Sequence, residues 1–188
     1  MEENISKALE VLRRGGLILY PTDTVWGIGC DATDPEAVDK VYKLKKREDK
    51  LSMIILLDKA DSVVRWVEQV PEVAWELWEV ADKPLTLILP GGRGVASNML
   101  PDERSVAIRL VDNKFCRKLI HRLGRPLVST SANISGEPTP ARFSDISPAI
   151  SAEVDFVVDP SLEEPSATHR PSSMIKLGLN GMVEVIRK

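Results

Sequence analysis

Cysteine and histidine, two residue types that often carry chemistry, are scarce in this sequence of 188 residues. It has two cysteines, Cys30 and Cys116, and two histidines, His121 and His169. Because the cysteines lie far apart and the histidines are so few, the sequence lacks the spaced ligands of a zinc site, and we expect no metal centre. A domain of this size can bury a full core without disulfides, so both cysteines are expected to be packed or partly exposed thiols.

Long apolar runs are also missing. No stretch of 18 or more apolar residues occurs, so we expect no membrane-spanning helix and no membrane partner. The first ten residues, MEENISKALE, are charged from the start and do not follow the basic-then-apolar order of a signal peptide. The sequence therefore predicts a cytoplasmic protein.

Basic residues do not predominate either. The chain has 25 Lys and Arg against 28 Asp and Glu, a formal net charge of −3, whereas nucleic-acid binders usually show a basic balance or patch. Residues 40–50, KVYKLKKREDK, are a local exception, with six basic residues against two acidic ones. This cluster fits a solvated helix end, where cations are favourable, as well as it fits a binding site.

Composition and periodicity predict one α/β domain over residues 1–188. Hydrophobic residues make up 43% of the chain and charged residues 28%, which is ordinary for a globular protein. Helices are expected at 4–14, from Asp34-Pro35 onward, and at 59–69, 71–80, 112–123 and 143–150. Strands are expected at 17–20, 51–57, 85–89, 105–110, 126–129, 154–158, 172–177 and 182–187.

The end of the chain decides the type of sheet. Asn180-Gly181 indicates a hairpin between the last two strands, whereas the earlier strands alternate with helices. This combination predicts a layered domain with a mixed parallel and antiparallel sheet. Trp66, Trp75 and Trp78 occur at helical spacing, so we expect them in the core and not in a base-stacking platform.

Three polar segments adjoin predicted strands. The segments 21–32 (PTDTVWGIGCDA) and 129–136 (STSANISG) come at strand ends, and 45–50 (KKREDK) precedes the strand at 51–57. Strand ends are where α/β folds usually bind ligands, although Ser/Thr/Asn-rich loops are also common turns. Arg109 lies near the end of a further apolar strand, where it either faces solvent or needs an anionic partner.

Several catalytic motifs are absent. The sequence has no GxxxxGK[ST] phosphate loop, no GxGxxG, no GxSxG nucleophile turn and no close carboxylate pair of the glycosidase type. Cations and hydroxyl groups therefore predict a site for polyanions, as in phosphoryl or nucleotidyl transfer by positioning and charge stabilisation.

Together these segments resemble the YrdC/Sua5 family of threonylcarbamoyl-AMP synthases. The resembling pieces are PTDTVWGIGCDA, the K-x-R of residues 45–47 with Lys50, KPLTLIL (83–89), SVAIRL (105–110), STSANISGEP (129–138) and the closing PSSMIKL with Arg187. They occur in family order over residues 15–187, and the first and fifth strings are specific. The chain resembles the short, single-domain members of the family.

This resemblance implies a three-layer YrdC-like domain with a twisted mixed sheet and a large concave cavity. It implies synthesis of L-threonylcarbamoyladenylate from L-threonine, bicarbonate and ATP with Mg²⁺, which is the first step toward N6-threonylcarbamoyladenosine at position 37 of tRNA. Further partners implied are tRNA or double-stranded RNA and the downstream tRNA-modification proteins.

The resemblance also implies roles for individual residues. Those expected to hold threonine are Thr24, Arg109, Ser129 and Ser172. Those expected to hold the nucleotide are Arg47, Lys50, Ser105, Ser131, Asn133, Thr139 and Arg187. Lys45, Arg47 and Lys50 are expected to neutralise charge on the transferred phosphates.

Two alternatives stay open. One is a YciO-type paralogue with a different or weak activity, which is favoured because aliphatic residues around Ile55 stand where the family has a histidine near threonine. The other is a module that binds double-stranded RNA or tRNA without catalysis. A net charge of −3 argues against RNA binding as the sole role.

Overall fold

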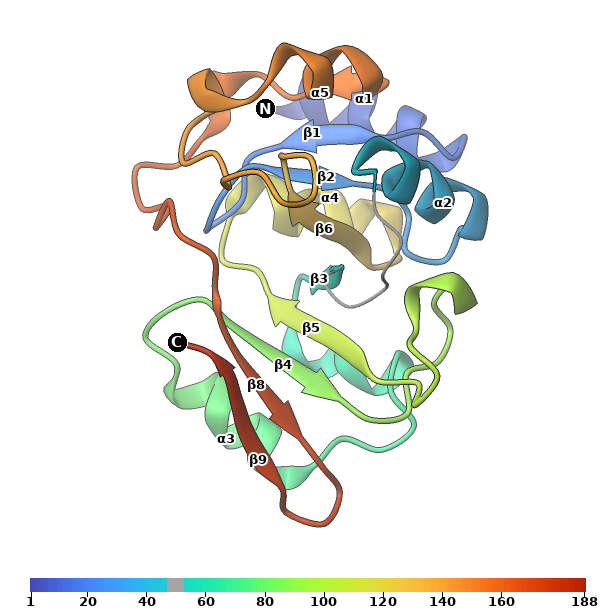
Figure 1. The fold of residues 1–188 in the computed structure, drawn as a ribbon, viewed down its shortest axis with the longest axis vertical. Coiled ribbons are helices and arrows are strands. Elements are labelled where there is room, and N and C mark those ends of the chain that lie inside the picture. Colours follow the sequence, from blue (N-terminus) through green and yellow to red (C-terminus); the bar gives the residue numbers. More distant parts are fainter. Residues whose placement is uncertain (47–52) are drawn as a thin grey trace.

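The computed structural model describes residues 1–46 and 53–188. In this part of the chain nine strands form one sheet in the order β7-β1-β2-β6-β3-β5-β4-β8-β9. The pairs β1–β7, β3–β5 and β4–β8 are parallel and the other neighbours are antiparallel. The expected mixed sheet is thus confirmed, and Figure 1 shows it running from β1 at the top to β9 at the bottom.

The strands span β1 Ile18–Tyr20, β2 Gly27–Gly29, β3 Ile54–Leu57, β4 Leu85–Leu89, β5 Val106–Leu110, β6 Leu127–Ser131, β7 Phe156–Val157, β8 Ser173–Leu177 and β9 Val183–Arg187. The helices span α1 Glu2–Arg13, α2 Pro35–Leu44, α3 Glu72–Val80, α4 Lys114–Leu123 and α5 Pro148–Glu153. Short 3₁₀ turns are η1 Ala60–Arg65, η2 Ser97–Met99, η3 Phe143–Asp145 and η4 Pro160–Leu162.

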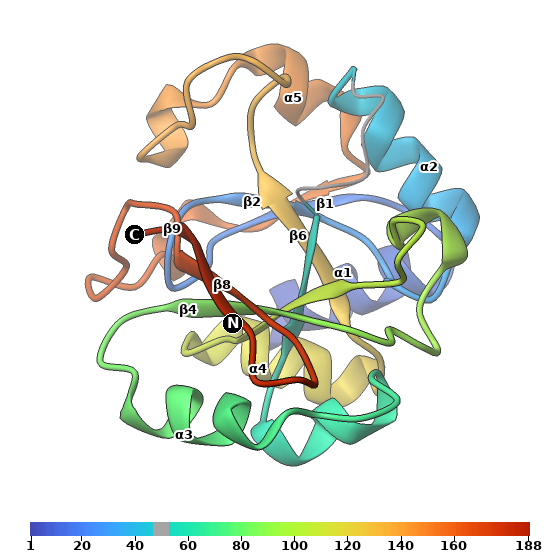
Figure 2. The same ribbon diagram turned by 60° about the horizontal axis from the view of Figure 1, so that its bottom comes forward.

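Helices cover both faces of the sheet and make three layers. Alternate side chains of β3 enter different cores, with Ile55 in one apolar cluster and Ile54 in the other. The Ile54 cluster is covered by α1 and α4, which pack on each other, and the Ile55 cluster takes side chains from α2, α3 and α5. In the view of Figure 2, α3 lies at the bottom and α2 and α5 lie at the top.

Local sequence signals set several element boundaries. Asp34 caps α2 as expected, because its carboxylate accepts from the backbone N–H groups of Glu36 and Ala37. Asn113 caps α4 in the same way, and Gly124 ends that helix in the left-handed conformation. The hairpin between β8 and β9 is confirmed, with Gly181 at φ 82°.

Some sequence expectations need correction. Residues 27–29 form β2 in the middle of the segment expected to be a polar loop. The helix expected at 59–69 is only the 3₁₀ turn η1, and the helix expected at 143–150 divides into η3 and α5. Ser144 and Ser147 lie between Phe143 and α5, and Pro148 begins α5. These residues favour turns and helix starts over one continuous helix. The strand expected at 51–57 begins at Ile54 within the described residues.

The tryptophans expected in the core are partly buried against it. Trp66, Trp75 and Trp78 pack against the cluster that contains Ile55, and the rings of Trp75 and Trp78 meet at a centroid distance of 6.0 Å. Within the described residues no helix has both the length and the apolar character needed to cross a bilayer.

Candidate active site

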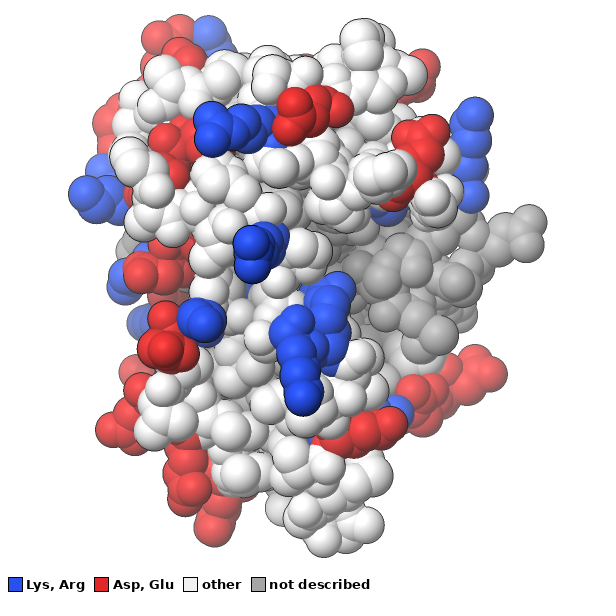
Figure 3. Space-filling model, turned by 60° about the vertical axis from the view of Figure 1, so that its left-hand side comes forward, with Lys and Arg blue, Asp and Glu red and all other residues white. Residues whose placement is uncertain are grey.

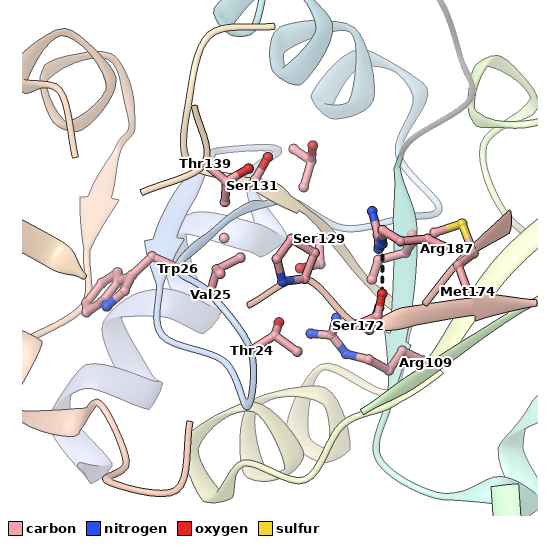
Figure 4. A pocket seen from close by; sticks show the side chains of 14 residues that line it. Thr24, Val25, Trp26, Arg109, Ser129, Ser131, Thr139, Ser172, Met174 and Arg187 are labelled. Atoms are coloured by element: carbon pink, nitrogen blue, oxygen red, sulfur yellow. Dashed lines mark hydrogen bonds between the residues drawn. The ribbon is translucent and has the colours of Figure 1, made fainter. Parts of the chain in front are cut away.

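A polar pocket of about 170 Å³ lies on the face of the sheet that carries Ile54. Its wall is built from six strands and three loops that are far apart in the chain. The lining residues are Thr24, Val25, Trp26, Gly27, Ile54, Arg109, Ser129, Thr130, Ser131, Thr139, Pro171, Ser172, Met174 and Arg187. Figure 4 shows the side chains of Thr24, Ser129, Ser172, Arg109 and Arg187 converging on the same space.

The loop before β2 is folded tightly around its own hydroxyl groups. The Thr22 hydroxyl donates to the carbonyl of Val25 at 2.8 Å and accepts from the backbone N–H of Thr24 at 3.0 Å. Behind the loop, β2 approaches β6 so closely that a Cβ on Gly29 would lie 2.5 Å from the carbonyl oxygen of Val128. Only glycine fits at this position. Because Gly29 has no side chain, β2 packs closely on β6, and the loop before β2 lies against the floor of the pocket.

Arg109 is buried in the pocket wall beside an acidic partner. Its Nη2 lies 3.0 Å from Oδ1 of Asp23 and 3.4 Å from the Thr22 hydroxyl, and both charged side chains are less than a tenth exposed. The other carboxylate oxygen of Asp23 accepts from the backbone N–H of Asp112. Asp23 therefore neutralises and orients the arginine, while Arg109 Nε has no hydrogen-bond partner among the described residues.

A second arginine enters from the edge of the sheet. Arg187 on β9 donates from Nε to the carbonyl of Ser172 at 2.8 Å. Partial burial lowers the pKa of Arg187, and the positive charge of Arg109 lowers it further. Two guanidinium groups that repel each other in one pocket favour an anion between or beside them.

Ser172 and Thr86 share a buried hydrogen bond of 2.7 Å between their hydroxyl groups. Thr86 lies in β4 between Arg109 of β5 and Met174 of β8, with which it is directly paired. This bond fixes the start of β8 against the floor of the pocket.

Lys45 sits at the end of α2 and is almost completely buried. Its ammonium group donates to the carbonyls of Ser131 and Asn133 at 2.6 and 2.7 Å. The Asn133 amide in turn donates to the carbonyls of Ile134 and Glu137. Lys45 and Asn133 therefore shape the loop after β6, and the side chain of Asn133 keeps an oxygen, Oδ1, with no partner among the described residues.

The loop that precedes β8 closes one side of the pocket. Backbone N–H groups of Thr168 and His169 donate to the carbonyls of Asp23 and Thr24, each at 3.0 Å. The carboxylate of Glu163 accepts from the indole of Trp26 at 2.6 Å. Residues 159–172 thus form a strap across the loop before β2, and the strap delivers Ser172 to the pocket.

Most of the site residues expected from the sequence meet here. Seven of them line the pocket: Thr24, Arg109, Ser129, Ser131, Thr139, Ser172 and Arg187. Ser105 stands at the opposite end of β5 from Arg109, outside the lining residues, and its hydroxyl donates to Glu103 at 3.2 Å. Arg47 and Lys50 lie outside the described residues, so their assignment stays a prediction.

Sequence reasoning missed Asp23, Ile54 and Met174 as parts of the site. Asp23 could have been found, because an acid that closely follows a predicted buried strand, in a segment without basic residues, needs a distant cation. Ile54 and Met174 carry no such signal, since their places in the pocket follow from strand register alone.

The face in Figure 3 has an uneven charge distribution. Basic side chains gather near its centre, whereas acidic side chains are concentrated toward its edges. Among the described residues no group of three or more His, Cys, Asp or Glu is arranged to hold a metal ion.

Comparison with known proteins agrees with this fold and shows the family. The family model Sua5_yciO_yrdC, described as telomere recombination, matches residues 10–188. A threonylcarbamoyl-AMP synthase of Stenotrophomonas maltophilia is 32% identical over 84% of this chain and 87% of its own length. One of Pseudoalteromonas translucida is 26% identical over 97% of both chains. The chain therefore belongs to the Sua5/YciO/YrdC family.

Solved structures show the same architecture. P. abyssi Sua5 complexed with L-threonine superposes with a TM-score of 0.83 at 29% identity, covering 92% of this chain. The chain spans only 50% of that Sua5 chain. E. coli YciO gives a TM-score of 0.84 at 23% identity and covers the whole chain, which supports the three-layer fold.

Proposed function

We propose that this protein is an L-threonylcarbamoyladenylate synthase, which makes the product from L-threonine, bicarbonate and ATP for N6-threonylcarbamoyladenosine formation in tRNA. The observation that carries the proposal is the convergence of Arg109, Arg187 and several hydroxyl groups in one pocket. That arrangement suits a carboxylate and a phosphate chain held side by side. Relatives that match most of this chain bear the same enzyme name.

The reaction needs positioning more than it needs a protein nucleophile. Bicarbonate takes up a proton and loses water to give carbon dioxide. The threonine amine then attacks the carbon of carbon dioxide and releases a proton, which gives a carbamate. A carbamate oxygen then attacks the α-phosphorus of ATP, and pyrophosphate leaves with the bonding electrons. The protein's part is to align these groups and to stabilise negative charge.

The assignment of residues follows the two ends of the pocket. Arg109 pairs with the threonine carboxylate, and the lining hydroxyls of Thr24, Ser129 and Ser172 surround the amine and carbamate. The nucleotide is assigned to Ser131, Thr139 and Arg187 in the pocket and to Ser105 and Asn133 outside the lining residues. Arg47 and Lys50, which lie outside the described residues, are assigned to the nucleotide as well.

Lys45, Arg47 and Lys50 are assigned to the charge of the leaving pyrophosphate. Mg²⁺ bound to ATP takes most of its ligands from phosphate oxygens and water, which is compatible with the lack of an acidic cluster among the described residues. The unpartnered Oδ1 of Asn133 is the protein oxygen best suited to it.

Further parts of the proposal concern context. We place the enzyme in the cytoplasm as a single domain over residues 1–188, with downstream tRNA-modification proteins as consumers of its product. Binding of tRNA or double-stranded RNA is proposed as a secondary property, supported by the basic side chains at the centre of the face in Figure 3.

Pyrophosphate release from ATP and bicarbonate, with and without threonine, tests this proposal. We expect release that requires threonine, and formation of threonylcarbamoyl-AMP by mass spectrometry. Release that is indifferent to threonine would instead favour a YciO-type activity. The aliphatic residues of β3, which stand where the family has a histidine near threonine, favour this alternative. Salt-sensitive RNA binding without any release would point to a binding module.

A further inference from the structure

Apolar side chains line part of the pocket, and the proposed chemistry uses none of them. Ile54 on β3 and Met174 on β8 are each 8% exposed, and both face the cavity. Val25, in the loop before β2, is a third apolar lining residue. A purely phosphate-binding pocket gains nothing from such a wall, so the wall indicates an apolar part of the ligand.

Strand register places this wall beside the proposed amino-acid position. Ile54 is directly paired with Ser129, and Met174 is separated from Arg109 by Thr86 alone. Directly paired residues point to the same face with Cβ atoms about 4.5–5.5 Å apart. A carboxylate on Arg109 therefore brings the rest of an amino acid into contact with the two apolar side chains, and Figure 4 shows Met174 on the same side of the pocket as Arg109.

The Thr24 hydroxyl, on the opposite side of the pocket, is positioned to accept a hydrogen bond from the ligand. Thr22 uses its single hydroxyl proton on the carbonyl of Val25, so we assign the Thr24 hydroxyl as the donor in the 2.9 Å contact between Thr22 and Thr24. Thr24 consequently presents lone pairs to the pocket, which suits the N–H groups of an amine. Amine and carboxylate are thus both provided for, and the ligand's side chain is left facing Ile54 and Met174.

We propose that this chain selects its amino acid by shape against an apolar wall and not by a hydrogen bond to the side-chain hydroxyl. Valine, which replaces the threonine hydroxyl with a methyl group of similar size, is then a competing substrate. The inference rests on the proposed function. An apolar pocket shaped for valine rejects threonine by only about 100-fold, whereas sites built to bind a substrate hydroxyl reject the analogue without it by about 10⁴–10⁵-fold.

The test is the ratio of kcat/KM for threonine to that for valine, measured by pyrophosphate release with ATP and bicarbonate. We expect a threonine-to-valine ratio below about 10³, short of the 10⁴–10⁵-fold rejection by sites that bind the substrate hydroxyl. Stimulation by threonine with a larger ratio overturns the shape selection but leaves the proposed function standing. If neither amino acid stimulates release, the proposed function fails and this inference fails with it.

A matched pair of variants locates the effect. Ile54→Thr adds a hydroxyl to the wall while shortening the side chain by one heavy atom, and we expect it to raise the threonine-to-valine ratio about tenfold, the worth of one hydrogen bond. Ile175→Thr makes the same change one residue beyond Met174, where the side chain packs on the opposite face of the sheet. It should leave the ratio unchanged. Equal ratios in both variants would contradict the assignment of Ile54 to the side-chain position.

Discussion

At the scale of single residues, the ion pair of Asp23 and Arg109 governs the site. Both charges are buried, so each depends on the other for compensation. Asp23 also ties the pocket to the chain behind it, since its second oxygen accepts from the backbone of Asp112. The same arginine therefore has a structural task and a proposed binding task, and the two need to be separated by experiment.

Removing one partner of this pair should be costly. We expect Arg109→Ala to lower the free energy of unfolding by about 3–5 kcal/mol, because the carboxylate of Asp23 is left buried without compensation. The double variant Asp23→Asn with Arg109→Met should recover most of that stability, as measured by urea denaturation. Neither variant should show threonine-dependent pyrophosphate release. Threonine dependence in the stable double variant would refute the role of Arg109.

A substitution of Lys45 separates the binding of ATP from the binding of threonine. Lys45→Met removes the donor to the carbonyls of Ser131 and Asn133, so the loop after β6 should loosen and the KM for ATP should rise several-fold. The KM for threonine should change less, because Arg109 and Thr24 are held by other contacts. The neighbouring exposed Lys46 is the control, and Lys46→Met should leave both KM values near those of the parent protein. A rise confined to threonine would contradict this picture.

At the scale of elements, β2 is the strand that sequence periodicity could not find. It has three residues, two of them glycine, and neither alternation nor branched side chains mark it. Its conformation is imposed by pairing with β1 and β6 and by the ring of Tyr20 in β1. The strand β6 is distant in the sequence, and the contacts with β1 form only on folding. The longer amphipathic helices and apolar strands were predictable because their own patterns specify them.

A substitution in β2 tests this dependence on close approach. Gly29→Ala would place a methyl group 2.5 Å from the carbonyl oxygen of Val128 and 2.6 Å from Tyr20. We expect a loss of stability of about 1–3 kcal/mol from overpacking, seen as a lower Tm. Gly136→Asn is the control, since a Cβ there meets no atom within 4 Å and asparagine tolerates a positive φ, here 88°. An unchanged Tm for Gly29→Ala would mean that β2 and β6 separate at little cost.

At the scale of the whole molecule, the sequence predicted seven of the residues that meet in the pocket but not how they are held. The motifs place Thr24, Ser129, Ser131 and Arg187 in one pocket, and the structure agrees. Their partners escaped prediction because those contacts depend on register, as with Met174, or on the path of the strap at 159–172. Long-range placement of this kind arises from tertiary packing and leaves no local pattern in the chain.

The two thiols report on the integrity of both cores. Cys30 and Cys116 are fully buried, and burial raises the pKa of each thiol above its usual range. Alkylation by iodoacetamide at pH 8 should therefore be very slow in the native protein and fast in urea, as followed by mass spectrometry. The nearly complete protection should extend to both cysteines equally. Rapid native labelling of either one would show that its side of the sheet opens readily.

The alternation of side chains along β3 carries an evolutionary consequence. Ile54 belongs to the pocket and Ile55 to the opposite core. A shift of β3 by one residue would therefore move the pocket-facing side chains into the core and the core side chains into the pocket. Insertions and deletions upstream can accumulate only if they are absorbed before this strand begins. Family members can thus differ in the length of the preceding basic segment while their pocket walls change by substitution alone, which makes position 54 a natural place for substrate preference to diverge.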